Sequence, residues 1–230
     1  MKNPLRVLLI CLALGLIVGA VYWAVYGNEK REGERRQVDR IIETLNLSPG
    51  QVVADLGAGD GIFTRPLARK VGHAGVVYAI EIKQRLLKKI EEKAREQGLQ
   101  NIRPVLAAED DPKLPEPVDL ILIVDTLHHI SNRETYLKNL RRYLKPSGRV
   151  AIIDFSDSWP WFHGKMKYSL AELEVWMKAA GFAQVEKHDF VKKTSFIDQI
   201  TVCYQAFFNT KGQRVKGSKK TKQIKPVTLL

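Results

Sequence analysis

The stretch Val52-Val53-Ala54-Asp55-Leu56-Gly57-Ala58-Gly59-Asp60-Gly61 decides the fold expected for this chain. An apolar run long enough for a buried strand ends in an acid, and three glycines follow at alternate positions. Glycine lets the backbone turn sharply and approach a ligand without an intervening side chain. Ile62 to Val71 then has a helical pattern, so its free N–H groups and positive dipole end would point into the same loop. The stretch therefore predicts a nucleotide-sized site at the carboxyl edge of a sheet.

The composition indicates one sizeable globular domain with appendages, because the chain has 230 residues and 45% apolar content. Its net charge of +12 is concentrated at the ends. Residues 211–225 carry seven basic residues and no acid, whereas residues 37–210 are nearly neutral. The folded body has no basic stripe with interleaved aromatics, so a nucleic acid is not the expected partner. The two cysteines, Cys11 and Cys203, indicate no disulfide framework.

A membrane anchor is predicted near the N-terminus, where residues 7–26 contain no charge. As a helix they would span about 30 Å, the thickness of a bilayer core. Aromatic residues gather near one end, at Tyr22, Trp23 and Tyr26, as in an interfacial belt. A cleaved signal peptide is the rival, with a cut at Val18-Gly19-Ala20, but the apolar run exceeds the usual length of about 7–15 residues. A buried core helix is disfavoured because it would lack any polar face.

The excess of basic residues after this segment places the remainder of the chain on the cytoplasmic side. The expected organisation is an anchor at 1–27, a charged linker at 28–36, a catalytic domain at 37–210 and a basic disordered tail at 211–230. For the tail three roles stay open: a solvated end, a contact with anionic lipid worth about 1 kcal/mol per residue near the surface, or an RNA contact.

Between the ends, hydrophobic periodicity predicts alternating helices and strands. A first helix from Arg36 buries Val38, Ile41, Ile42 and Leu45 and ends at Ser48-Pro49-Gly50. Strands are expected at Val52–Leu56, Val76–Ile80, Ile102–Leu106, Val118–Val124, Val150–Ile153, Ala183–His188 and Phe196–Phe207. Helices are expected at Ile62–Val71, Arg85–Gln97, from a capping box at Ser131–Glu134 through Leu144, and from a capping box at Ser169–Glu172 to Ala180, with a turn at Pro146–Gly148. The prediction is a Rossmann-like, doubly wound α/β sheet of seven strands, mostly parallel, with a C-terminal antiparallel hairpin.

The parallel strands would deliver acidic residues to one edge, where ligands bind in open α/β sheets. These acids are Asp55, Glu81, the cluster Glu109-Asp110-Asp111, Asp125 and Asp154. Glu81 ends the second strand and suits acceptance of hydrogen bonds from ribose hydroxyls. The glycine spacing differs from the G-x-G-x-x-G pattern of dinucleotide sites. Asp55 and Asp60 would repel a diphosphate and suit a ligand with a cationic amine, which disfavours an NAD-dependent oxidoreductase.

These motifs resemble those of the class I S-adenosylmethionine-dependent methyltransferases over roughly Val38 to Phe207. The Asp55-x-Gly57-x-Gly59-x-Gly61 loop resembles that family's first motif, which implicates Asp55, Gly57, Ala58, Gly59 and Gly61 in binding S-adenosyl-L-methionine. Glu81 matches the ribose-binding acid and Ile82 the apolar residue beside the adenine. The run Asp110-Asp111-Pro112-Lys113-Leu114-Pro115 resembles the D-A-x-x-L-P stretch whose acid reaches the adenine amino group. Asp111 replaces a small residue there, so either acid could make that contact.

Two further motifs extend the resemblance. Asp125-Thr126-Leu127-His128-His129 is similar to the fourth-strand motif of the subgroup that includes quinone-biosynthesis methyltransferases, and it implicates Asp125 in cofactor binding. Leu144-Lys145-Pro146-Ser147-Gly148-Arg149 resembles the L-K-P-G-G-x turn, with Ser147 in place of a glycine. The resemblance implies in-line attack of a nucleophile on a sulfonium methyl group, so the protein mainly positions the partners.

A general base is needed only if the nucleophile carries a proton, and His128 and His129 are the candidates. The alternative for each histidine is pocket lining or a hydrogen bond to backbone. Asp154 would orient substrate or cap the next turn, and no metal site is expected. The aromatic segment Trp159-Pro160-Trp161-Phe162 would pack over the sheet edge or sit at an interface and admit a lipophilic substrate.

The expected protein is thus a single-pass membrane methyltransferase that uses S-adenosyl-L-methionine and a small-molecule acceptor of lipophilic character. Three alternatives remain: methyl transfer to protein or RNA, a membrane protein that binds the cofactor without catalysis, and an oxidoreductase that uses NAD.

Overall fold

The computed structural model describes residues 14–17, 32, 35–155, 164, 166–188 and 199–206. By its internal contacts the chain divides into two compact units, Met1–Leu47 and Ser48–Leu230. In the first unit, residues 14–17 and 35–44 are helical. Ile41, Ile42 and Leu45 are buried, as the periodicity of the second of these helices predicts, and Val38 is half-buried.

The predicted anchor at residues 7–26 lies outside the described residues except for 14–17. Within that short helical piece the large side chains Leu14, Leu16 and Ile17 are exposed. No helix in the part of the chain that the structure describes is long and apolar enough to cross a membrane.

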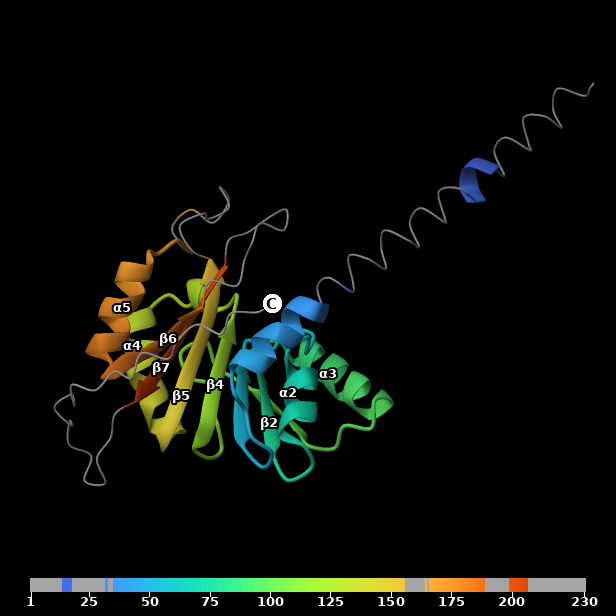
Figure 1. The fold of residues 1–230 in the computed structure, drawn as a ribbon, viewed down its shortest axis with the longest axis horizontal. Coiled ribbons are helices and arrows are strands. Elements are labelled where there is room, and N and C mark those ends of the chain that lie inside the picture. Colours follow the sequence, from blue (N-terminus) through green and yellow to red (C-terminus); the bar gives the residue numbers. More distant parts are fainter. Residues whose placement is uncertain are drawn as a thin grey trace, which may run out of the picture. The chain divides into compact units, whose positions relative to one another are not determined.

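The second unit is built on one sheet with the strand order β3-β2-β1-β4-β5-β7-β6 (Figure 1). Its strands are β1 (Val52–Leu56), β2 (Val76–Glu81), β3 (Ile102–Leu106), β4 (Val118–Val124), β5 (Leu144–Phe155), β6 (Phe182–His188) and β7 (Gln199–Ala206). The first five strands are parallel, which confirms the predicted α/β class and its parallel sheet. β7 lies between β5 and β6 and is antiparallel to both.

This order places a topological switch between β1 and β4. The chain moves outward from β1 to β2 and β3, and then returns to form β4 on the other side of β1. Loops that leave the carboxyl ends of β1 and β4 therefore separate in opposite directions, and such a point is where open α/β sheets bind their ligands. The central strand β4 buries Val118 and every residue from Leu120 to Ile123, as its continuous apolar sequence predicts.

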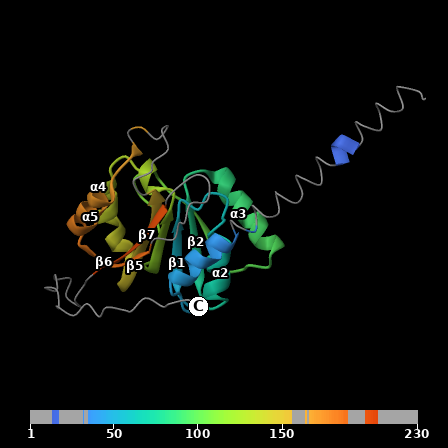
Figure 2. The same ribbon diagram turned by 45° about the horizontal axis from the view of Figure 1, so that its top comes forward.

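Helices cover the two halves of the sheet (Figures 1 and 2). α2 (Thr64–Val71) and α3 (Gln84–Glu96) pack on the half formed by β1, β2 and β3. α4 (Arg133–Leu140) and α5 (Leu170–Ala179) pack against each other beside the other half. Two 3-10 helices, η1 (Leu127–His129) and η2 (Arg141–Tyr143), follow β4 and α4.

The helix starts differ from two of the predictions. α2 begins at Thr64 rather than Ile62, because the Gly61 N–H donates to the Ala58 carbonyl in a turn that precedes the helix. The capping box predicted at Ser131 is wrong: Asn132 is the N-cap, and its side chain accepts from the Thr135 N–H. The second capping box is confirmed at α5, where Ser169 and Glu172 bond reciprocally.

The turn predicted at Pro146–Gly148 is wrong as well, because these residues lie inside the long strand β5. The pairing of β5 with β4 shifts register there, from Val118 opposite Leu144 to Leu120 opposite Arg149. The extra residues of β5 are therefore accommodated in a bulge. Such a bulge lets a proline and a glycine, which weaken regular strands, stay within one.

Candidate cofactor and acceptor site

The loop after β1 requires glycine at its first position. Gly57 has φ of +78°, and a Cβ atom there would lie 2.2 Å from the Thr126 Oγ1 atom in the loop after β4. The two loops at the topological switch therefore touch, and only a residue without a side chain fits between them. Gly59 also has positive φ, +56°, but a Cβ there would meet open space. The backbone conformation, not crowding, accounts for glycine at this second position.

Four amides of this loop, those of Gly57, Ala58, Gly59 and Gly61, are already used within the protein. The Gly57 and Ala58 N–H groups both donate to the Ile80 carbonyl at 2.9 Å, and the Gly61 N–H donates to Ala58. These amides cannot also cradle a pyrophosphate, as the amides of a dinucleotide-binding loop do. The prediction of free N–H groups concerned the start of the following helix, and it stays a prediction. The satisfied amides of the loop favour a ligand without a diphosphate.

Glu81 is positioned at the end of β2 by three backbone donors. Its Oε2 accepts from the Gly59 N–H at 3.1 Å, and its Oε1 accepts from the N–H groups of Ile82 at 3.0 Å and Lys83 at 3.1 Å. The carboxylate is almost buried, at 8% exposed. It thus ties the glycine loop to the adjacent strand end.

Apolar side chains surround this carboxylate at the sheet edge. Ile82 is 50% exposed, and Leu106, which pairs with Glu81 across β2 and β3, is 49% exposed. Ile62, in the turn before α2, is 54% exposed. Exposed large apolar residues beside a carboxylate are suited to a ligand that combines a flat base with a sugar.

Asp55 is buried beneath the loop rather than open to it. It is 2% exposed, and the Thr64 hydroxyl donates to its Oδ2 at 2.5 Å. Burial raises the pKa of Asp55 to about 6, the nearby Glu81 charge adds to the rise, and the Thr64 bond opposes it. The side chain therefore ties β1 to the first turn of α2, and its charge is held under the site.

Asp60 faces the lysines of α3. Its carboxylate lies 2.8 Å from the Lys93 Nζ and 3.5 Å from the Lys89 Nζ. The hydrogen bond from Lys93 is the largest cause of a pKa below the ordinary value. Because two cations neutralise this acid, it gives no argument against a diphosphate. The used amides of the loop give that argument instead.

The acidic cluster after β3 is divided between two roles. Asp111 accepts from the Tyr143 hydroxyl at 2.6 Å and from Arg142 at 2.5 Å, so it fastens this loop to η2. Burial opposes ionisation of Asp111, but the hydrogen bonds from Tyr143 and from the Lys113 N–H, with the Arg142 charge, hold its pKa below the ordinary value. Asp110 is exposed. Glu109 is exposed as well, so the geometry removes Asp111 from the candidates and leaves the exposed acids before it.

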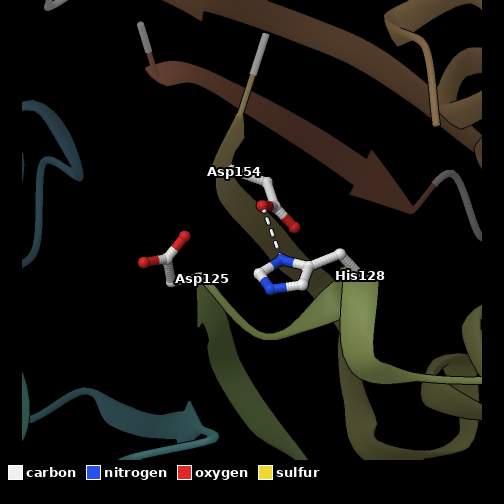
Figure 3. A group of neighbouring side chains, drawn as sticks. All are labelled: Asp125, His128 and Asp154. Atoms are coloured by element: carbon white, nitrogen blue, oxygen red, sulfur yellow. Dashed lines mark hydrogen bonds and ion pairs between the residues drawn. The ribbon is translucent and has the colours of Figure 1, made fainter. Parts of the chain in front are cut away.

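A second group of side chains lies at the carboxyl ends of β4 and β5. Asp125, His128 and Asp154 bring polar atoms within 4.8 Å of one another (Figure 3). His128 and Asp154 are buried, at 3% and 4% exposed, and the His128 Nδ1 lies 2.9 Å from the Asp154 Oδ1. Asp125 is exposed and adopts the left-handed conformation, with φ of +51°. The spacing of this group suits one shared small ligand, a proton or a cation.

The two candidate histidines occupy different environments. The His129 ring is exposed, and its centroid lies 4.1 Å from that of His128. The predicted alternative, a histidine bonded only to backbone, does not describe His128, because its ring is joined to a buried carboxylate. Tyr168 completes this arrangement, since its hydroxyl donates to the Asp154 Oδ2 at 2.8 Å.

Some of these residues carry little signal in the sequence. Asp154 could be located from its position at a strand end, in line with Asp55 and Asp125. Tyr168 and Arg133 could not be located from the sequence. Tyr168 precedes a helix cap and Arg133 begins a helix, and neither residue type is distinctive at such a position. The aromatic segment at 156–163 lies outside the described residues.

The fold and the site together define a Rossmann-like α/β domain in which a carboxylate at the end of β2 is bonded to the glycine loop, and the loop amides form no open cradle for a diphosphate. A sequence profile described as "Methyltransferase domain" matches residues 47–223. The chain belongs to this family, the methyltransferase domains that use S-adenosylmethionine.

Individual relatives agree with that placement. A ubiquinone/menaquinone biosynthesis C-methyltransferase, UbiE, from Burkholderia vietnamiensis is 31% identical over 121 residues, which are 51% of this chain and 49% of that protein. The chain therefore spans about half the length of the curated relatives it matches. A solved structure of a SAM-dependent methyltransferase from Aquifex aeolicus superposes with a TM-score of 0.61 at 26% identity, covering 73% of this chain and 88% of that one.

The fold alone does not define one reaction. The structure of the [4+2]-cyclase SpnF superposes with a TM-score of 0.63 at 18% identity, covering 74% of this chain and 80% of that one. At that identity the likeness concerns the fold only. Function has to be argued from the residues of the site.

Proposed function

We propose that this protein is a membrane-anchored methyltransferase that transfers the methyl group of S-adenosyl-L-methionine to a lipophilic small molecule. In this proposal Glu81 accepts the ribose hydroxyls, Ile82 lies against the adenine, and Asp110 accepts from the adenine amino group. The loop of Gly57, Ala58, Gly59 and Gly61 passes close to the amino acid part of the cofactor. Asp55 and Asp125 supply negative charge beneath and beside the sulfonium centre.

One observation carries the choice of cofactor. The amides of Gly57, Ala58 and Gly61 are satisfied within the protein, while the Glu81 carboxylate is held by backbone donors at the adjacent strand end. This arrangement offers acceptors to a cationic, hydroxyl-bearing ligand and withholds donors from a diphosphate. It therefore supports S-adenosylmethionine over NAD. When bound, that cofactor supplies an already activated methyl group, so the protein needs to orient the two reactants and exclude water.

Titration calorimetry with each ligand tests this function. We expect S-adenosylmethionine to bind and NAD not to bind. Glu81→Ala should weaken the binding of S-adenosylmethionine at least tenfold, because each hydrogen bond to a charged group contributes about 1.5–3 kcal/mol. The control Glu116→Ala, at an exposed residue that bonds Tyr78, should leave the dissociation constant unchanged. Tight NAD binding without S-adenosylmethionine binding would refute the proposal.

The lipophilic acceptor is supported by two features. The run at 7–26 has the length and composition of a membrane span, and the described turn within it exposes Leu14, Leu16 and Ile17. An enzyme tethered beside a bilayer meets acceptors dissolved in it. The name of the Burkholderia relative refers to ubiquinone and menaquinone biosynthesis, which makes a quinone precursor the favoured class, with a phospholipid headgroup, protein and RNA as alternatives.

Methyl transfer is tested separately from cofactor binding. The purified protein would be given S-adenosylmethionine with a labelled methyl group and a total lipid and metabolite extract, and the labelled product identified by mass. A labelled product soluble in organic solvent is expected. If the cofactor binds tightly and no fraction becomes labelled, the chain is a cofactor-binding protein without this activity.

A further inference from the structure

The side chains at the carboxyl ends of β4 and β5, Asp125, His128 and Asp154, include a pair arranged as in a general base. Their central contact is the bond of 2.9 Å between the His128 Nδ1 and the Asp154 Oδ1, with both side chains buried. A buried carboxylate next to an imidazole accepts a hydrogen bond from the N–H group at Nδ1, which fixes the tautomer. The second ring nitrogen, Nε2, then carries the lone pair. Figure 3 shows this nitrogen on the side of the ring away from Asp154.

The carboxylate is itself held in place. The Tyr168 hydroxyl donates to the second oxygen of Asp154 at 2.8 Å, so each carboxylate oxygen has a fixed partner. Two donors on one carboxylate restrict its rotation. The imidazole is therefore oriented by a group that is oriented in turn, which is the arrangement of a general base rather than of a surface histidine.

Arg133 connects the backbone on both sides of this group. Its guanidinium donates to the carbonyls of Leu127 at 3.2 Å, His128 at 2.7 Å and Met166 at 2.9 Å. Its Cζ lies 5.3 Å from the ring centroid of Tyr168 and 5.7 Å from that of Trp176. One cation thus joins the turn η1 to the segment that carries Tyr168, and the aromatic rings restrict its movement.

We propose that His128 is the proton acceptor in methyl transfer, that Asp154 and Tyr168 are positioning residues acting through it, and that the acceptor is a phenolic or enolic hydroxyl compound. This inference rests on the proposed function and specifies its substrate class. In the step, the acceptor's proton passes to the His128 Nε2 while its oxygen, or the ring carbon conjugated with it, attacks the methyl carbon. The methyl–sulfur bond breaks, its electron pair stays on sulfur, and the sulfonium becomes a neutral thioether.

An imidazole base favours an acceptor whose hydroxyl group is acidic. A phenol loses its proton near pH 10, about three to four units above ordinary imidazole, and water only near 15.7. A phenolic or enolic proton therefore passes to an imidazole during attack more easily than the proton of an aliphatic alcohol, which is the weaker acid. The resulting anion spreads its charge over oxygen and ring carbons, so the same base serves oxygen or carbon methylation. After attack through carbon the product is a dienone, which returns to the phenol when the methylated carbon loses its proton to solvent and the oxygen gains one.

The test compares variants on whichever acceptor fraction the wild-type protein labels, with a naphthoquinol as a defined probe beside it. His128→Gln keeps a hydrogen-bonding group of similar size but cannot accept a proton, and we expect the transfer rate to fall about 10²- to 10⁴-fold. The dissociation constant for S-adenosylmethionine should change less than about threefold. His73→Gln, the same change at an exposed turn before β2, is the matched control and should keep the wild-type rate.

For Asp154 and Tyr168 the experiment must measure a quantity that changes only if they act through His128, and not if they merely support the fold. An amide at position 154 can donate to Nδ1 and so select the wrong tautomer, and Asp154→Asn should then lose nearly as much rate as His128→Gln. Histidine ¹⁵N chemical shifts should show the proton moved from Nδ1 to Nε2. Tyr168→Phe should give a smaller loss.

Several outcomes would overturn the inference. They are a transfer rate in His128→Gln within tenfold of wild type, an equal fall in cofactor affinity, or a larger loss in His129→Gln than in His128→Gln. A labelled product bearing its new methyl group on an aliphatic amine would also overturn it. So would inactivation by a chelator with recovery on adding Mn²⁺, since these residues would then serve a cation. Tight S-adenosylmethionine binding with no labelling at all would instead mean that the proposed function has failed.

Discussion

At the scale of single residues, burial and contact decide which of several similar acids serve the site. Asp55, Asp60, Glu81, Asp110 and Asp111 all lie near strand ends or in the glycine loop, and the sequence alone does not show which of them are buried or already paired. In the structure one is buried under Thr64, one is neutralised by two lysines, one is held by three amides and one is fastened to η2. Of these five acids, Asp110 is the exposed one, and Glu81 stands at the end of β2 beside the glycine loop.

Asp55 should make the protein less stable as the pH rises from about 4 to about 6. Its folded pKa of about 6 lies above the ordinary value of 3.8, so the folded state holds the proton more firmly than the unfolded state in this interval. Stability from this group is present below about pH 4 and is lost as the pH passes about 6, a change of about 3 kcal/mol. Urea unfolding of the wild type and Asp55→Asn across this interval measures it.

The neutral variant should lack this part of the pH dependence, because the amide that replaces the carboxylate keeps an oxygen acceptor for Thr64 but does not titrate. Asp60→Asn is a control of opposite sign. The pKa of Asp60 is lowered by Lys93, so its contribution is present at neutral pH and is lost as the pH falls. Parallel profiles for the wild type and Asp55→Asn would contradict the assignment.

At the scale of elements, short segments that carry no regular periodicity connect the pieces of the site. The 3-10 helix η2 holds the loop after β3 through Asp111, and η1 carries His128 beside β5. Periodicity located the strands and the long helices well, because burial alternates along them in a fixed way. It could not locate three-residue helices, whose position depends on what they pack against.

In the acidic cluster after β3, Asp110 and Asp111 have different proposed roles, and their substitutions should therefore have different effects. Asp110→Ala should weaken binding of S-adenosylhomocysteine about tenfold, because one charge-assisted hydrogen bond to the adenine amino group is lost. The same variant should bind S-inosylhomocysteine, which has no such amino group, as well as the wild type does. Asp111→Ala should weaken both ligands alike, because it releases the loop from η2. Titration calorimetry with the two ligands measures this, and the reverse pattern would exchange the roles of the acids.

At the scale of the whole molecule, the proposed location depends on the segment before the domain. An apolar run of this length inserts into a bilayer unless charges interrupt it, and an arginine near its centre costs about 2.5–3.5 kcal/mol. We therefore expect the full chain to float with liposomes. Leu14→Arg combined with Ile17→Arg should leave it at the bottom of the gradient, while Leu14→Ile with Ile17→Leu should float. Flotation of the arginine variant would show that another part of the chain, such as the basic tail, holds the membrane.

The sequence by itself determined the α/β class, the five parallel strands and the sheet edge at which the acids and the glycine loop gather, because these depend on local periodicity and on glycine and acid placement at strand ends. Only the tertiary structure decided that the loop amides are satisfied at Ile80, that Asn132 rather than Ser131 caps α4, and that His128 rather than His129 meets Asp154. The last of these contacts joins residues 26 positions apart in the chain. Its formation depends on how strands align in the sheet, and no local pattern encodes that alignment.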